Sequence, residues 1–122
     1  MGLDATIKRS DGQPLGKLAS VQEALALAFP GIVFGRLPSG SEKIQEAAKM
    51  GVVFPDIIRQ HLESSPAKYN GEYEGPDFFA EFVLGSEDVV QQVDVVLRGT
   101  TQAAEPMLTF LEERFGWVTT HP

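Results

Sequence analysis

The residues best suited to do chemistry lie in one stretch, KYNGEYEGPDFFAEF, which spans residues 68–82. It holds four acidic side chains together with two tyrosines and three phenylalanines. Carboxylates at alternate positions of a loop are ligands for Ca²⁺. The same carboxylates on a protein surface attract a basic partner. A third interpretation is an ordinary solvated connection that leads into a strand.

The stretch matches the spacing of an EF-hand calcium loop but not its chemistry. The first, third, fifth, sixth and twelfth loop positions would be Asn70, Glu72, Glu74, Gly75 and Glu81. The first ligand is normally Asp, and Glu at the third and fifth positions is one methylene too long for a tight loop. From Phe78 onward the sequence alternates like a strand, where an EF-hand needs a helix. We therefore expect no metal site and no cofactor.

The same residues have a simpler structural interpretation. Asn70-Gly71 is a strong signal for a type I′ turn, because both residues tolerate positive φ. Gly75-Pro76 then redirects the chain into the strand. This interpretation predicts a long surface connection over residues 64–77. Loops of that length are often functional, so residues 66–77 could cover a neighbouring face as a lid.

Other candidate groups are isolated along the chain. His61 has no second histidine at a metal-ligand spacing, and it borders either the core or a helix end. Arg98-Gly99-Thr100-Thr101 could bind an anion at a strand end, but this pattern is short and common, and a turn followed by a helix cap explains it better. The sequence contains no nucleophile elbow, no phosphate loop and no cysteine. These observations favour a non-enzymatic role.

Hydrophobic periodicity predicts the elements that position these residues. Residues 3–9 alternate as a half-buried strand. A capping box at Ser20–Glu23 predicts a helix that ends at Pro30-Gly31, and a second box at Ser39–Glu42 predicts a helix to about residue 50. Between them, residues 32–37 are apolar on both faces, which predicts a strand that is central or well covered. A third helix follows Pro55, with Ile58 and Leu62 facing the core.

The second half of the chain carries the clearest strand signal. Residues 78–84 and 89–98 predict a hairpin in which Ala80 faces Val93 and Leu84 faces Val89. The predicted outward face contains Phe79, Glu81, Val83, Val90, Gln92, Asp94, Val96 and Arg98. A helix over residues 105–115 ends at Gly116, and Trp117 begins a short terminal strand.

The element order β-α-β-α-α-β-β-α-β predicts one α+β domain over residues 1–122. We expect a two-layer sandwich with helices on one face of a mostly antiparallel sheet, ferredoxin-like or related. The second face of such a sheet is open unless a loop or partner covers it. Glu81, Asp94 and Arg98 are predicted on that face beside Asp4, Thr6 and Lys8.

The charge distribution indicates which partners are compatible. The net charge is −7, and residues 63–94 hold eight acidic residues against one basic residue. Such a surface repels phosphate backbones, so we expect no nucleic-acid binding. It favours a basic protein partner or a homodimer. We also expect a soluble, cytoplasmic protein, because no membrane span or signal peptide is visible and cysteine is absent.

Two functional hypotheses remain open. The first is a small acidic interaction module, similar in size and acidity to the immunity proteins that neutralise bacterial toxins. Its predicted interaction residues are Tyr69, Glu72, Tyr73, Glu74, Asp77, Phe79, Glu81, Asp94 and Arg98. The second is a small enzyme or ligand-binding domain in which residues 66–77 form a lid over Glu81, Asp94 and Arg98.

Overall fold

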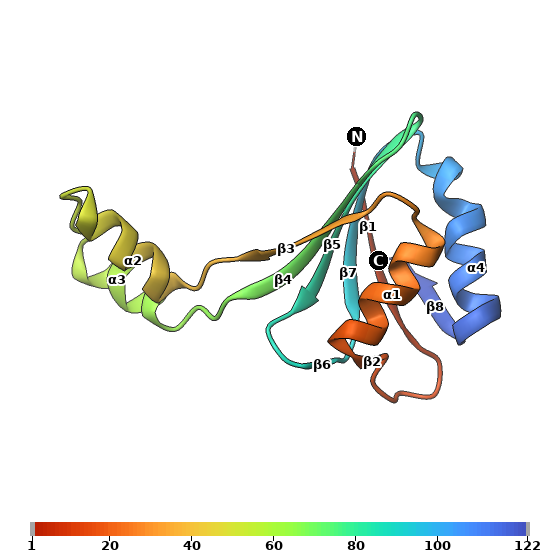
Figure 1. Ribbon diagram of the computed structural model, residues 1–122, viewed down its shortest axis with the longest axis horizontal. Helices are drawn as coiled ribbons and strands as arrows, with labels where there is room; N and C mark the ends of the chain where they lie inside the picture. The colour runs from red at the N-terminus through yellow and green to blue at the C-terminus, as the bar shows by residue number, and fades with distance from the viewer. Residues whose placement is uncertain (1, 122) are drawn as a thin grey trace.

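A computed structural model describes residues 2–121 as a sheet-based body with a long projecting arm (Figure 1). Six strands form an antiparallel sheet in the order β3-β4-β5-β7-β1-β8. These strands are β1 (Gly2–Arg9), β3 (Val33–Leu37), β4 (Lys68–Glu74), β5 (Phe78–Gly85), β7 (Val93–Gly99) and β8 (Trp117–Thr120). A small second sheet pairs β2 (Gly16–Lys17) with β6 (Val89–Val90). The predicted mixed α+β class is confirmed.

The helices divide into two groups. Helices α1 (Leu18–Ala28) and α4 (Glu105–Phe115) pack on the body, and a 3₁₀ turn, η1 (Thr101–Ala104), precedes α4. Helices α2 (Gly40–Lys49) and α3 (Asp56–Glu63) pack on each other at the far end of the arm (Figure 1). In the part of the chain that the structure describes, no helix is long and apolar enough to cross a bilayer.

The core lies between the sheet and the two body helices. Along β5 every second side chain is buried, from Phe78 through Phe82 to Leu84, because successive residues of a strand point to opposite faces. Phe29, at the end of α1, is fully buried and lies 4.9 Å from Phe82 between ring centroids. Burial of this apolar face is the main stabilising term of the body.

Helix α1 begins earlier than its predicted capping box. Its N-cap is Lys17, which makes no side-chain cap, and Ser20 lies inside the helix. The Leu18 N–H instead donates to the Asp88 carbonyl at 2.7 Å, next to the β2–β6 pair. A contact with a distant segment therefore sets the start of this helix. The capping box at Ser39 is present as predicted.

The pairing of β5 with β7 is confirmed, but its register differs from the symmetric hairpin. Ala80 lies opposite Leu97 rather than Val93. Val89 and Val90 leave the ladder to pair with β2, so Val90 is buried and Val89 is exposed, the reverse of the prediction. The shift spans an even number of residues, so the other predicted faces are unchanged.

Two predictions about the strands beside β5 are wrong. Residues 68–74 are not a connection with a turn at Asn70-Gly71 but strand β4, paired on both sides. A Cβ at Gly71 would lie 3.1 Å from the side chains of Ile32 and Phe34, so this glycine provides close packing rather than a turn. Strand β3 is not central but forms the sheet edge, with Val33 exposed.

The arm continues from β3 and returns through β4. A Cβ on Gly40 would lie 1.6 Å from the Leu62 carbonyl oxygen, so a glycine is required where α2 approaches the end of α3. Leu62 is half-buried within this helix pair, whereas Ile58 is exposed. The prediction that these two residues face the main core is wrong, because α3 packs on α2 and not on the body.

A matched pair of substitutions on β5 tests this core. We expect Phe82→Ala to lower the free energy of unfolding by about 3–5 kcal/mol, because it leaves a cavity beside Phe29. Phe79→Ala, on the opposite face of the same strand, is expected to cost about 1 kcal/mol. Urea denaturation followed by circular dichroism measures both values. Equal losses would contradict the assignment of the two faces.

Candidate functional site

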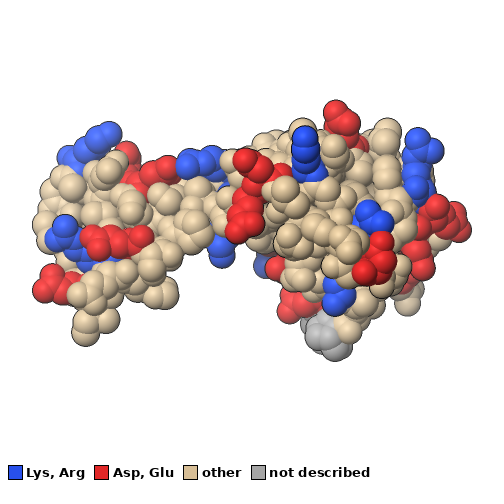
Figure 2. Space-filling view, turned by 90° about the horizontal axis from the view of Figure 1, so that it is seen from below, with Lys and Arg blue, Asp and Glu red and all other residues tan. Residues whose placement is uncertain are grey.

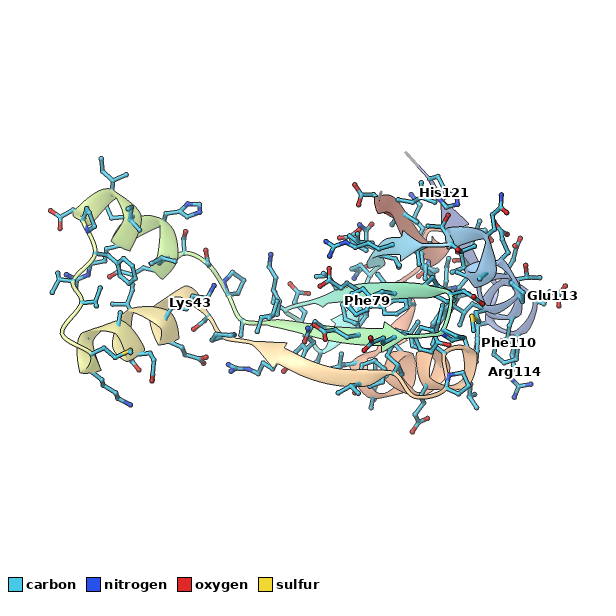
Figure 3. All side chains as sticks on the ribbon, turned by 90° about the horizontal axis from the view of Figure 1, so that it is seen from above. Lys43, Phe79, Phe110, Glu113, Arg114 and His121 are labelled. Atoms are coloured by element: carbon cyan, nitrogen blue, oxygen red, sulfur yellow. The ribbon has the colours of Figure 1, made fainter. Side chains whose placement is uncertain are left out.

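The sheet face opposite α1 and α4 carries a mixed charged and apolar surface, called the open face below. Directly opposed residues share a face, so the register places Glu72 beside Glu81, Glu74 beside Phe79, and Arg98 beside Phe79. Figure 3 shows Phe79 lying over the sheet. The members of the open face include Asp4, Thr6, Lys8, Asn70, Glu72, Glu74, Phe79, Glu81, Val83, Asp94, Val96 and Arg98, and Val33 lies opposite Glu72 at its β3 edge.

The open face mixes apolar and charged side chains. Phe79, Val83 and Val96 are half-buried and lie at diagonal positions of β5 and β7, with Glu81 between Phe79 and Val83; we call these three residues the apolar cluster. Glu81 and Arg98 approach to 3.8 Å between Oε2 and Nη2, with both side chains largely exposed. Such a pair contributes little stability in water. The arrangement suits contact with another surface rather than support of the fold.

Asp94 lies beside a hollow on this face. Its Oδ1 accepts hydrogen bonds from Thr6 Oγ1 at 3.4 Å and from Gln92 Nε2 at 3.2 Å. The hollow has a volume of about 340 Å³ and is lined by Asp4, Thr6, Thr120 and His121 besides Asp94. Glu81 and Arg98 do not line it. The three residues predicted beneath the lid, Glu81, Asp94 and Arg98, therefore do not converge on one hollow.

The structure brings together six of the nine predicted interaction residues. Glu72, Glu74, Phe79, Glu81, Asp94 and Arg98 share the open face. Tyr69 and Tyr73 lie on the helix side of the sheet, where Tyr73 is buried with its ring 5.5 Å from that of Phe29. Asp77 is exposed between β4 and β5, and its carbonyl accepts the Thr100 N–H.

The lid predicted over residues 66–77 is not present. Residues 68–74 are built into the sheet, so they cannot cover its open face. His61 is exposed, and its carbonyl accepts hydrogen bonds from Ser64 and Ser65 at the end of α3. Within residues 2–121, no group of three or more His, Asp or Glu side chains is arranged to hold a metal ion.

The arm is a second candidate surface, and the sequence analysis did not identify it. Ten large apolar side chains are exposed in the described residues, and seven of them lie between residues 33 and 58. Five form what we call the tip patch: Met50, Val52, Val53, Ile57 and Ile58. Figure 2 shows the arm as a separate lobe on a narrow neck. The sequence feature that could have indicated this surface is the apolar run from Met50 to Phe54, which lies between two short helices.

An ion pair between Arg36 and Glu42 lies where β3 continues into the arm. The Arg36 guanidinium donates to both carboxylate oxygens of Glu42, at 2.7 and 3.1 Å. Glu42 also completes the capping box with Ser39. The hydrogen bond from Arg36 is the main reason that the pKa of Glu42 lies below its ordinary value, and the same bond raises the pKa of Arg36. The pair orients α2 relative to the sheet edge.

Comparison of this chain with protein-family models, with curated proteins and with solved structures finds no match.

The Arg36–Glu42 ion pair lowers the pKa of Glu42, and this effect can be tested by titration. We expect NMR titration to give a pKa for Glu42 below that of an ordinary glutamate, and Arg36→Met to return it to the ordinary range. The folded-state pKa is the lower one, so this pair stabilises the arm above the unfolded-state pKa and loses that effect as the pH falls. Lys43→Met is the control, because it removes a nearby charge but leaves the Arg36 bond. An unchanged Glu42 pKa in Arg36→Met would contradict the assigned ion pair.

Proposed function

We propose that this protein is a non-enzymatic interaction module whose open face binds a basic protein surface. The observation that supports the proposal is the arrangement of that face. Half-buried Phe79, Val83 and Val96 alternate in the register with the charged side chains of Glu81, Asp94 and Arg98, and Glu72 lies beside Glu81. Apolar side chains gathered on an otherwise charged surface can mark a protein interface.

The charge of this surface favours basic partners over acidic ones. The body carries most of the net negative charge. Residues 38–67, the arm between β3 and β4, hold three basic and four acidic residues, and the remainder holds seven basic and thirteen acidic residues, a net charge of −6. Long-range attraction would speed encounter with a basic partner, and the apolar cluster would then contribute to affinity. Partners with phosphate backbones would be repelled.

An enzyme is the alternative function, and the geometry favours it less. An enzymatic function of this kind requires Glu81, Asp94 and Arg98 to surround one pocket beneath a lid. Residues 68–74 are instead part of the sheet, and the hollow beside Asp94 contains neither Glu81 nor Arg98. A site that shifts a carboxylate pKa also needs burial, whereas Asp94 and Arg98 are exposed.

We also propose that the body has a ferredoxin-like core. The strand order β8-β1-β7-β5, with α1 and α4 on one face, supports a split β-α-β arrangement. Strands β3 and β4, with the arm between them, would then be an insertion between α1 and β5. The absence of cysteine is compatible with a cytoplasmic location. Neither property identifies a function, because one architecture serves many.

Neutralising the open face tests the proposal. Basic proteins captured from cells on the immobilised chain are purified, and their binding is measured by calorimetry at low and high salt. We expect the triple variant Glu72→Gln, Glu81→Gln, Asp94→Asn to weaken binding by about tenfold or more, because it removes charge at the contact. Binding by the unaltered protein should weaken as salt screens the charges.

The control variant removes the same number of carboxylates from α4, through Glu105→Gln, Glu112→Gln and Glu113→Gln. These residues are exposed on the helix side of the body. The expected change in affinity is below about threefold, because the net charge falls equally but the contact is intact. Equal effects of the two triples, or binding that does not respond to salt, would overturn the proposed role of the open face.

A further inference from the structure

Strand β3 is an uncovered edge of the six-stranded sheet. It pairs with β4 on one side only, so the backbone N–H and C=O groups on its other side have no strand partner. Val33 is 69% exposed and Leu37 is 47% exposed. Proteins usually protect such an edge with charge, a bulge or a covering segment, because it is a template for pairing with another chain. Here both ends of the edge are apolar.

The residues of this edge are complementary to themselves. In an antiparallel pair of two β3 strands related by a twofold axis at Gly35, Val33 of each copy lies opposite Leu37 of the other. Paired residues share a sheet face, so the two apolar side chains would contact across the axis. Gly35 at the centre has no side chain to obstruct the approach. A contact of this kind closes on itself and gives a dimer rather than a fibre.

The charges beside the edge agree with this pairing. On β4, Lys68 lies opposite Leu37 and Glu72 lies opposite Val33. The twofold axis reverses the direction of the second copy. Each Leu37–Val33 contact would therefore be flanked by Lys68 of one chain and Glu72 of the other. Opposite charges on the two sides of an apolar contact favour this register, whereas a parallel pairing would place like charges together.

The arms supply the additional area that a stable dimer needs. Two strands of five residues bury too little surface alone, since specific interfaces bury about 800 Å² on each partner. Each arm follows β3 at Leu37, so in the antiparallel pair it would pass the β3 start of the other copy. The arm, residues 38–67, holds three basic and four acidic residues, so its contact with the second body depends on the exposed apolar side chains of the tip patch rather than on net charge.

We propose that this chain forms a twofold homodimer in which the β3 edges pair about Gly35 and each arm packs on the body of the second copy. The interface extends the proposed interaction role and uses the β3 edge and the arm, with Glu72 at the border between this surface and the open face. It accounts for the seven exposed apolar side chains between residues 33 and 58 with one occupant. It also provides a contact for the two short helices of the arm.

Sedimentation and light scattering of the full chain at micromolar concentration test the dimer. The expected mass is twice the chain mass of 13.3 kDa. Val33→Lys with Leu37→Lys, and separately Val53→Asp with Ile57→Asp, should shift the protein to the monomer mass. All four side chains are exposed in one copy, so these changes leave the fold intact. The control Val89→Lys changes an exposed valine elsewhere and should remain dimeric.

A single cysteine tests the register in the otherwise cysteine-free chain. Gly35→Cys should cross-link to itself with a short bis-maleimide, because the two residues lie opposite each other at the axis. Its Cβ would lie 3.1 Å from Asn70 Oδ1, a side-chain atom that can move. Val118→Cys, on the other sheet edge, is the control that should not cross-link.

A monomer at every concentration would overturn the homodimer, as would a dimer that survives both pairs of substitutions. A polymer, or a dimer without the Gly35→Cys cross-link, would overturn the twofold β3 pairing. These outcomes are distinct from failure of the open-face proposal. The tip-patch variant Val53→Asp with Ile57→Asp should keep the affinity for a basic partner within about threefold, because it leaves the open face unchanged.

Discussion

Strand β5 is the element on which the rest of the structure depends. It pairs with β4 on one side and β7 on the other, and its alternation separates two chemically different faces. The inward side chains pack around Phe29 with α1, while the outward ones supply Phe79, Glu81 and Val83 to the open face. A one-residue slip of this strand would exchange the two faces and destroy core and candidate site together.

The arm exists because the long segment 38–67, which contains α2 and α3, connects strands β3 and β4. Figure 1 shows that its helices lie beyond the sheet, where they cannot share the main core. Helices of ten and eight residues are only marginally stable without packing. Local devices therefore support them: the Ser39 capping box, the Arg36–Glu42 pair and the close approach at Gly40. They orient the arm but leave its tip patch exposed.

The molecule thus has two surfaces with different physical character. The open face combines acidic charge with a small apolar cluster, which favours a partner of opposite charge. The β3 edge and the tip patch are largely apolar and nearly neutral, which favours burial by area and shape.

The sequence by itself determined the features that depend on neighbouring residues. Alternation predicted the buried faces of β1, β5 and β7, the Ser39–Glu42 box predicted the start of α2, and Gly116 predicted the end of α4. Alternation also predicted that Asp4, Thr6, Phe79, Glu81, Val83, Asp94, Val96 and Arg98 share the open face, because the period of a strand is two. Glu72 and Glu74 were instead predicted in a loop. Such signals lie within a few residues of the position that they describe.

Only the tertiary structure decided which strands are central, where Val89 and Val90 pair, and that residues 68–74 form a strand. Each of these outcomes depends on a partner segment that is distant in sequence. An apolar strand has the same pattern at an edge as in the centre, and Asn70-Gly71 has the same turn propensity until β3 and β5 pair with it. The exposure of the tip patch follows for the same reason: an apolar run indicates burial, but only the folded chain shows whether anything covers it.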